Sequence, residues 1–152
     1  MTIMTKTAIA ADVPSNPKMI ILEGVDRSGK GSLHEAIDKL TKYKHFVMDR
    51  GPIGFKAYCD IFEKGNELFD LYTEMENNLA KVPNVLVIYI DCDTEELIRR
   101  CKETDHEIID YSTHKYFYEI NYGESPLEKV KVSSTKMKPE EIVQKLIDMR
   151  LL

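Results

Sequence analysis

Residues 24–32 form the part of the sequence whose residue types and spacing most directly indicate chemistry. They read Gly-Val-Asp-Arg-Ser-Gly-Lys-Gly-Ser and contain the pattern G-x-x-x-x-G-K. Glycines let a loop turn back so that successive backbone N–H groups face one anion, and a helix beginning at the loop adds its positive end. The lysine would reach the outer phosphates of a polyphosphate chain. The stretch therefore predicts a phosphate-binding loop made by Gly24, Ser28, Gly29, Lys30, Gly31 and Ser32.

The residue after the lysine departs from the strict form of this motif. A hydroxyl residue is expected directly after Lys30, but Gly31 intervenes and Ser32 follows. Ser32, or a water molecule, would then complete the coordination of the Mg²⁺ that accompanies a nucleoside triphosphate. The alternative is a glycine-rich turn between a strand and a helix that binds nothing. The ligand-binding interpretation is favoured because the motif follows a predicted strand and precedes a predicted helix.

Short apolar runs and amphipathic segments alternate along the chain and would position this loop. The apolar runs at 19–23 and 85–91 are typical of buried parallel strands, and weaker runs predict strands at 45–49 and 129–132. Helices are expected over 30–42, 55–64, 66–79, 94–101, 111–122 and 139–149. This alternation predicts an α/β fold with a parallel sheet of four or five strands and helices on both faces. Ligands of such sheets lie outside the carboxyl ends of the strands, which here are 24–32, 49–54, 91–93 and 133–136.

Two helical stripes are expected to face the core, and the histidines to face solvent. The stripe in 66–79 consists of Leu68, Leu71, Tyr72, Met75 and Leu79, and that in 111–122 of Tyr111, Tyr118 and Tyr122. The spacing of His45, His106 and His114 is not that of metal ligands, so surface positions are expected for them.

Composition indicates one ordinary globular domain. The chain has 152 residues, of which 43% are hydrophobic and 31% charged, with a net charge of -5. We expect a mobile leader over 1–18 and a single domain over 19–152. The acidity disfavours a broad, non-specific grip on nucleic acid. Cys59, Cys92 and Cys101 are odd in number and lack C-x-x-C spacing, which favours a reducing, cytoplasmic location. No apolar run approaches the roughly 20 residues of a membrane span, so no membrane association is expected.

The sequence Leu22-Glu23-Gly24-Val25-Asp26-Arg27-Ser28-Gly29-Lys30 resembles the phosphate loop of the thymidylate kinases, E-G-x-D-x-x-G-K. Asp49-Arg50, after the second predicted strand, resembles the D-R motif of the same family. The resemblance implies the three-layer P-loop kinase fold, with a short parallel sheet flanked by helices. In its compactness the chain resembles the kinases of bacteriophages.

The resemblance also implies roles for individual residues. ATP would be the phosphate donor, Mg²⁺ the cofactor and a deoxynucleoside monophosphate the acceptor. Lys30 and Arg27 would clamp the transferred phosphates, and Asp26 would contact the acceptor's sugar or phosphate side. Arg50 would hold the acceptor phosphate, and Asp49 would assist Mg²⁺ through water. Arg99 and Arg100 are candidate lid arginines, for which a solvated helix end is the alternative; a structural turn is the alternative for Asp49-Arg50.

The acceptor side departs from the family pattern. One helix fills the interval between Lys30 and Asp49, where thymidylate kinases have several elements, and the family's D-R-[FY]-x-x-S has Gly51 and Gly54 in place of its aromatic residue and serine. Three alternatives therefore stay open: an acceptor nucleotide within DNA or RNA, a homodimer that closes the pocket, or a nucleotide-binding regulator without transfer activity. For a free nucleotide, the candidates for contact with the base are Phe55, Tyr58 and Tyr72, with core packing as their alternative.

Overall fold

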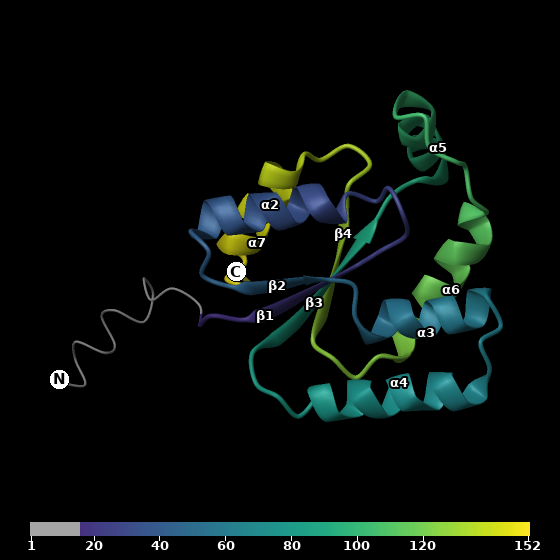
Figure 1. Cartoon of the computed structure of the whole chain (residues 1–152). Helices are drawn as coiled ribbons and strands as arrows, with labels where there is room; N and C mark the ends of the chain where they lie inside the picture. Colours follow the sequence, from purple (N-terminus) through teal and green to yellow (C-terminus); the bar gives the residue numbers. More distant parts are fainter. Residues whose placement is uncertain (1–15) are drawn as a thin grey trace, which may run out of the picture.

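The computed structural model describes residues 16–152 and shows strands and helices in alternation (Figure 1). The strands are β1 (Met19–Glu23), β2 (Phe46–Asp49), β3 (Val85–Asp91) and β4 (Lys129–Ser133). The helices are α2 (Lys30–Thr41), α3 (Pro52–Ile61), α4 (Asn66–Leu79), α5 (Thr94–Glu103), α6 (Tyr111–Glu124) and α7 (Pro139–Asp148). None of these helices has the length and apolar content that crossing a membrane requires.

The four strands form one parallel sheet in the order β2-β1-β3-β4, as the alternation of elements predicts. Leu22 of β1 is level with Asp49 of β2, and Asp91 of β3 is level with Ser133 of β4. All four carboxyl ends therefore lie at the same edge of the sheet, where ligands of such folds bind. Among the described residues, no strand pairs with the outer side of β2, so β2 is an edge strand.

Alternate side chains of the central strands enter two separate apolar cores, which gives the fold three layers. Ile20, Leu22 and Ile88 pack with α2 and α7 on one face, whereas Ile21 and Val87 pack with α3, α5 and α6 on the other. Figure 1 shows the same division, with α2 and α7 on one side of the sheet and α3 and α6 on the opposite side. Each face of a central parallel strand is covered, as its continuous apolar sequence requires.

Helix α3 begins three residues earlier than predicted. The sequence predicts a helix over 55–64, but α3 spans Pro52–Ile61. Gly51-Pro52 does end the strand region, and Pro52 then occupies the first turn of the helix. Proline is well suited to this place because its fixed φ matches the helix and the first N–H groups of a helix have no partner within it.

The predicted stripe of helix α4 is only partly buried. Leu71 is 56% exposed and Met75 is 45% exposed, while Glu76 is 1% exposed. Glu76 accepts a hydrogen bond from the Lys56 ammonium of α3 at 2.6 Å, so an ion pair occupies the centre of the α3–α4 contact. Helix α4 packs on α3, outside the helical layer that covers the sheet (Figure 1). Leu71 and Met75 lie on the part of the stripe that α3 does not cover.

The predictions for the tyrosines of α6 and for the histidines have different outcomes. Tyr111 and Tyr118 are 2% and 0% exposed, which confirms core packing. The surface prediction is wrong for His45 and His114, which are 6% and 8% exposed, and His106 is exposed as predicted. His45 is covered because its Nδ1 accepts a hydrogen bond from the backbone N–H of Lys18, at 3.0 Å.

Most of the expected leader, residues 1–15, lies outside the described residues. Its last residue, Lys18, is tied to the sheet, since its carbonyl also accepts the backbone N–H of Phe46 at 3.0 Å.

Candidate nucleotide-binding site

The loop between β1 and α2 has a backbone conformation that requires its glycines. Gly24 has a φ of +150°, and a Cβ there would lie 2.7 Å from Ser28 Oγ and 2.8 Å from the Ile90 carbonyl oxygen. Gly29 has a φ of +105° and accepts the first helical hydrogen bond, from the Leu33 N–H at 3.0 Å. The N-terminus of α2 therefore begins directly at the end of the loop. This is the arrangement that cradles anions in glycine-rich loops.

The Lys30 side chain lies across the loop. Its ammonium donates to the carbonyls of Gly24 and Val25, at 2.7 Å and 3.1 Å. Burial lowers the pKa of Lys30, and the positive charge of Arg50 lowers it further. The carboxylates of Asp26, Glu23 and Asp49 act in the opposite direction. Lys30 is thus a partly desolvated cation beside a second cation, an environment in which an anionic ligand is strongly favoured.

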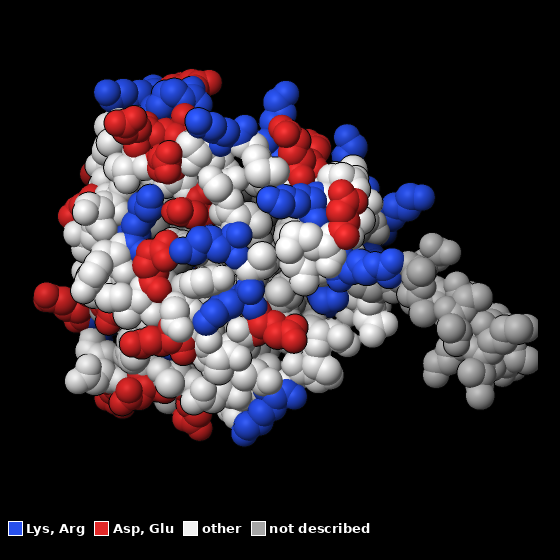
Figure 2. All heavy atoms as spheres, turned by 180° about the vertical axis from the view of Figure 1, so that it is seen from behind, with Lys and Arg blue, Asp and Glu red and all other residues white. Residues whose placement is uncertain are grey.

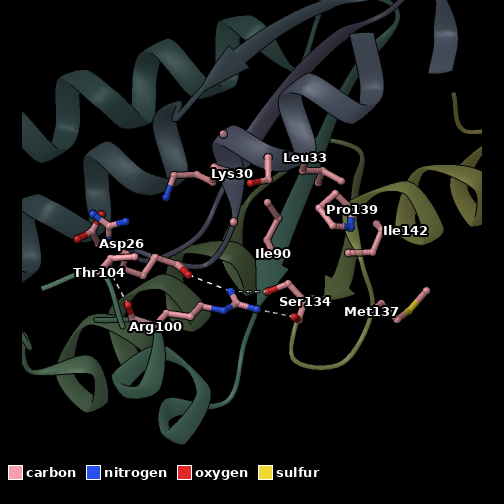
Figure 3. Close-up of a pocket in the computed structure, with 14 residues that line it drawn as sticks. Asp26, Lys30, Leu33, Ile90, Arg100, Thr104, Ser134, Met137, Pro139 and Ile142 are labelled. Carbon is pink, nitrogen blue, oxygen red and sulfur yellow. Dashed lines mark hydrogen bonds between the residues drawn. The ribbon is translucent and has the colours of Figure 1, made fainter. Parts of the chain in front are cut away.

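A pocket of about 590 Å³ opens on the loop and on Lys30 (Figure 3). One end is polar and contains Asp26 and Lys30. The other end is walled by side chains of α7 and of the segment before it, namely Met137, Pro139 and Ile142. A polar end against a helix N-terminus and an apolar end beyond it match a molecule with phosphates at one end and a flat base at the other. The apolar wall is not among the sequence predictions; Ser134, which also lines the pocket, lies in the strand-end segment 133–136.

The two candidate lid arginines lie in different places. Arg100 lines the pocket, and its guanidinium donates to the Arg27 carbonyl at 3.0 Å and the Ser134 carbonyl at 2.7 Å. Ser134 Oγ in turn donates to the Ser28 carbonyl at 2.7 Å. Arg100 and Ser134 therefore brace the outer side of the phosphate loop. Arg99 has a 59% exposed side chain that pairs with Glu96 and Glu103, so only Arg100 is part of this pocket.

Asp49 is the last residue of β2 and Arg50 follows it, at the same edge of the sheet as the loop. The Arg50 N–H donates to the Leu22 carbonyl at 2.8 Å, which places Arg50 beside the end of β1. Its φ is +84°, a left-handed value that is unusual for a residue with a Cβ. Its guanidinium lies over the Tyr58 ring with Cζ 4.3 Å from the ring centroid. Asp49 and Arg50 therefore lie next to the end of β1, where the loop begins, as the strand-end rule predicts.

The oxygen ligands expected for Mg²⁺ are few. Ser32 lines the pocket and is exposed, and the half-exposed Asp49 carboxylate lies 3.4 Å from His34 Nδ1. Among residues 16–152, no group of three or more His, Cys, Asp or Glu side chains could hold a metal ion. This donor set fits Mg²⁺, which is usually bound by one or two protein oxygens, several waters and the phosphates of a substrate. It does not provide an all-protein metal cage.

The three candidates for contact with an acceptor base are in different surroundings. Phe55 and Tyr72 pair with each other, with centroids 5.1 Å apart, and join α3 to α4. In the described part of the chain, Tyr58 is the one of the three that contacts Arg50. The Tyr58 ring stacks on Phe62 at 5.6 Å and meets His114 edge-on at 6.2 Å. Phe62 and His114 are not among the residues predicted from the sequence, because they lie at the end of α3 and in α6.

Comparisons with known proteins bear on the fold. No protein-family model and no curated protein matches the chain. The YorR protein from Bacillus subtilis, solved in complex with phosphorylated GDP, aligns with a TM-score of 0.68 and 16% identity over 87% of this chain and 95% of that one. The chain therefore shares the fold of YorR. Thymidylate kinase from Candida albicans aligns with a TM-score of 0.49 and 13% identity, over 90% of this chain and 92% of that one. The predicted three-layer α/β architecture is confirmed.

Proposed function

We propose that the chain is a nucleotide kinase that transfers the γ-phosphate of ATP to a deoxynucleoside monophosphate in the presence of Mg²⁺. The observation that carries the proposal is the approach of two cations, Lys30 at the start of α2 and Arg50 directly after β2. They are close enough that Arg50 lowers the pKa of Lys30, second only to burial. Two like charges held together in this way favour a polyanion between them. Phosphoryl transfer is catalysed mainly by positioning and by neutralising charge at such a point.

The donor would occupy the pocket of Figure 3. The loop amides and Lys30 would hold its β- and γ-phosphates, with Arg27 as a second clamp, and its base would lie against Met137, Pro139 and Ile142. Ser32 directly, and Asp49 through water, would hold Mg²⁺. The ion, when bound, would neutralise charge on the β- and γ-phosphate oxygens.

The acceptor would approach from the β2 side. Arg50 would bind its phosphate, Asp26 would contact its sugar or phosphate side, and Tyr58 would flank its base. An oxygen of the acceptor phosphate would attack the γ-phosphorus as the bond to the β-phosphate oxygen breaks. The products are a deoxynucleoside diphosphate and ADP.

An acceptor nucleotide within DNA or RNA is the second candidate, and the openness of the acceptor side favours it. β2 is an edge strand and the Asp49 side chain is 50% exposed, so this side of the site is open to solvent. The surface charge argues against it. On the face shown in Figure 2, basic and acidic side chains are interspersed rather than gathered into one basic patch. A free nucleotide is therefore the preferred acceptor.

A transfer assay with purified protein and Mg²⁺ tests the proposal. The donors are ATP and GTP, the latter because YorR was solved with phosphorylated GDP. The acceptors are the four deoxynucleoside monophosphates, GMP, oligonucleotides with a 5′-hydroxyl and oligonucleotides with a hydroxymethylated base. Transfer to a mononucleotide whose KM rises at least about tenfold in Arg50→Ala supports the proposal. Transfer only to oligonucleotides favours the second candidate, and nucleotide binding without any transfer favours a regulator.

A further inference from the structure

Glu23 belongs to the motif that resembles the thymidylate kinase loop, yet neither phosphate binding nor Mg²⁺ coordination gives it a role. It is the last residue of β1, and its side chain is 0% exposed. A buried carboxyl group is unfavourable unless hydrogen-bond donors surround it. Its partners show what it does.

The donors to Glu23 come from the turn that connects β2 to α3. The Gly54 N–H donates to Glu23 Oε2 at 3.0 Å, and the nearby Gly51 N–H also lowers the pKa of this carboxyl group. Gly51 is the N-cap residue of α3, and it has no side chain that could cap the helix. The first N–H groups of a helix need an acceptor from elsewhere, and a negative charge is favoured at this end. Glu23 therefore caps α3 from a different element.

The two glycines of this turn are required by the close approach to β1. A Cβ at Gly54 would lie 2.6 Å from Glu23 Oε1 and 2.7 Å from Arg50 Cγ. A Cβ at Gly51 would lie 2.6 Å from the Ile21 Cγ2 methyl. The larger residues expected at these positions from the resemblance would not fit. Gly51 and Gly54 thus have a structural reason: they let the turn reach Glu23.

Arg50 lies between the two attachments of this turn to β1. On one side its own N–H is bound by the carbonyl of Leu22, and on the other side the N–H of Gly54 is bound by Glu23. The left-handed φ of +84° at Arg50 is a strained value that persists only when the surroundings fix it. The direction of the Arg50 side chain follows from this backbone conformation. Two consecutive residues of β1 therefore set where the guanidinium points.

We propose that Glu23 is a positioning residue that fixes the turn from Arg50 to Gly54 and thereby aims the Arg50 guanidinium at the acceptor phosphate. This rests on the role of Arg50 in the proposed function. The charges of Lys30 and Arg50 also act on Glu23, so its carboxyl group joins the donor and acceptor sides of the site electrostatically.

Two variants separate positioning from a general effect on folding. Glu23→Ala removes the carboxyl group, whose Oε2 accepts the Gly54 N–H, and leaves that N–H without a partner. Glu23→Gln keeps the shape and one carbonyl oxygen, so it should retain the turn and act as the conservative rescue. Thermal unfolding of both variants establishes that they are folded before any other measurement.

Amide hydrogen exchange, followed by NMR, reads the turn directly. In Glu23→Ala we expect the Gly51 and Gly54 amides to exchange at least about tenfold faster, with the β1 and β3 amides unchanged. In Glu23→Gln their protection should be retained. If Glu23→Ala does not fold, Glu23→Asp, which withdraws the carboxyl group from the turn by one methylene, takes its place and should show the same loss of protection. Unchanged protection of both amides in a folded Glu23→Ala protein overturns the proposal.

The effect on Arg50 is measured in two further ways. With the acceptor identified by the transfer assay, Glu23→Ala should raise the acceptor KM at least about tenfold and leave the donor KM unchanged, and it should have little further effect in an Arg50→Ala background. Equal effects in both backgrounds overturn positioning through Arg50.

Titration with inorganic phosphate, read on the Arg50 side-chain Nε–H signal, needs no transfer. If the wild type transfers to no acceptor, the proposed function fails, while weaker phosphate binding in Glu23→Ala still supports positioning and unchanged binding overturns it.

Discussion

Arg50 lies over the ring of Tyr58, with its Cζ 4.3 Å from the ring centroid, and its Nη2 donates to the Tyr58 hydroxyl at 3.2 Å. A guanidinium has several N–H donors in one plane, so stacking fixes that plane while leaving donors for a phosphate. Tyr58 is itself held by the stacked ring of Phe62 and by the edges of His114 and Tyr118. The candidate acceptor site therefore has an aromatic wall that holds its arginine.

Substitutions at Tyr58 should separate the two contacts with Arg50. Tyr58→Phe removes a hydrogen bond, which contributes about 1 kcal/mol, and should raise the acceptor KM a few-fold. Tyr58→Ala also removes the stacking, which contributes about 0.5–2 kcal/mol, and should raise it roughly tenfold or more. Steady-state kinetics with varied acceptor measure both. Tyr116→Ala, on the 60% exposed Tyr116 of α6, is the matched control and should change nothing. An unchanged acceptor KM in Tyr58→Ala would contradict the assignment.

Lys30→Ala should abolish transfer and leave the fold intact. The ammonium contacts only loop carbonyls in the described structure, and removing a partly buried cation does not open the core. Loss of one preorganised charge at the reacting phosphates costs about a hundredfold or more in turnover. The control is Lys39→Ala, an exposed lysine of the same helix. Turnover near the wild-type value in a folded Lys30→Ala protein would refute the phosphate-loop mechanism.

Local patterns were sufficient to predict the loop, the sheet and the position of Asp49-Arg50. The loop is a contiguous motif between a strand and a helix, and the strands β1 and β3 are continuous apolar runs. The strand-end rule then places Arg50 beside the loop, because β1 and β2 are adjacent and parallel. These predictions need only residues that are close in sequence and one topological rule.

Features that depend on packing between distant segments could not be predicted in this way. Arg99 and Arg100 are adjacent in sequence and alike in chemistry, and only the rotation of α5 decides that Arg100 faces the loop. The contact of Ser134 with the loop joins residues 106 positions apart. Asp91 is likewise at the end of a strand, but its carboxylate lies 3.6 Å from the Lys115 ammonium and it does not line the pocket of Figure 3. The strand-end rule predicts the edge of the sheet at which ligands bind, but it does not predict the direction in which each side chain points.

The buried ion pair of Lys56 and Glu76 should be the largest single polar contribution to the attachment of α4. Both side chains are at most 5% exposed, and their atoms are 2.6 Å apart. Removing one partner leaves a buried charge, so Glu76→Gln should lower the free energy of unfolding by about 3–5 kcal/mol. Replacing both with Met and Leu should recover most of this loss. Urea denaturation measures the effect.

The exposed pair of Lys131 and Glu119 is the control for this experiment. Its atoms are also 2.7 Å apart, but the side chains are 41% and 40% exposed. Glu119→Gln should therefore change stability by less than about 1 kcal/mol. Equal effects of Glu76→Gln and Glu119→Gln would show that burial of the Lys56–Glu76 pair has no energetic consequence.

Stability should fall as the pH rises toward neutrality because of Glu23. Burial raises the pKa of Glu23 from 4.5 to about 7, against the lowering effects of the Gly54 and Gly51 N–H groups, Lys30 and Arg50. Tyr118 faces the same carboxyl group from α6. Between these two pKa values the folded protein holds a proton that the unfolded chain has released, so unfolding becomes easier with each pH unit. The slope should be about 1.4 kcal/mol per pH unit between roughly pH 5 and 7 and vanish above that range.

Glu23→Gln, which cannot ionise, isolates this contribution. The difference in unfolding free energy between the wild type and Glu23→Gln, from urea denaturation at pH 5 to 8.5, should change in favour of the variant as the pH rises to about 7. A difference that is independent of pH would show that Glu23 keeps an ordinary pKa in the folded protein.

Arg100 and Arg99 offer the sharpest test of the donor site, because they are neighbours in sequence with the same side chain. The guanidinium of Arg100 lines the pocket and binds the Arg27 and Ser134 carbonyls. Arg99 pairs only with carboxylates of its own helix in the described structure, and its hydrogen bond is the largest cause of the lowered pKa of Glu96, about 2. If the pocket holds the donor, Arg100→Ala should raise the donor KM about tenfold or more, since the loop loses its outer brace, and leave the acceptor KM nearly unchanged.

Arg99→Ala should leave both KM values unchanged, although the ion pairs at the surface of α5 are lost. Exposed ion pairs contribute little to stability, so Arg99→Ala should unfold near the wild-type temperature. Arg100→Ala also loses hydrogen bonds to the Arg27 and Ser134 carbonyls, so its circular dichroism spectrum must show an intact fold before its donor KM is interpreted. Thermal shift with ATP and Mg²⁺ gives an independent measure, since a bound donor stabilises the folded state by mass action. The shift should shrink in Arg100→Ala and persist in Arg99→Ala. If the two variants respond alike, the nucleotide does not reach Arg100, and the pocket between the loop and α7 is not the donor site.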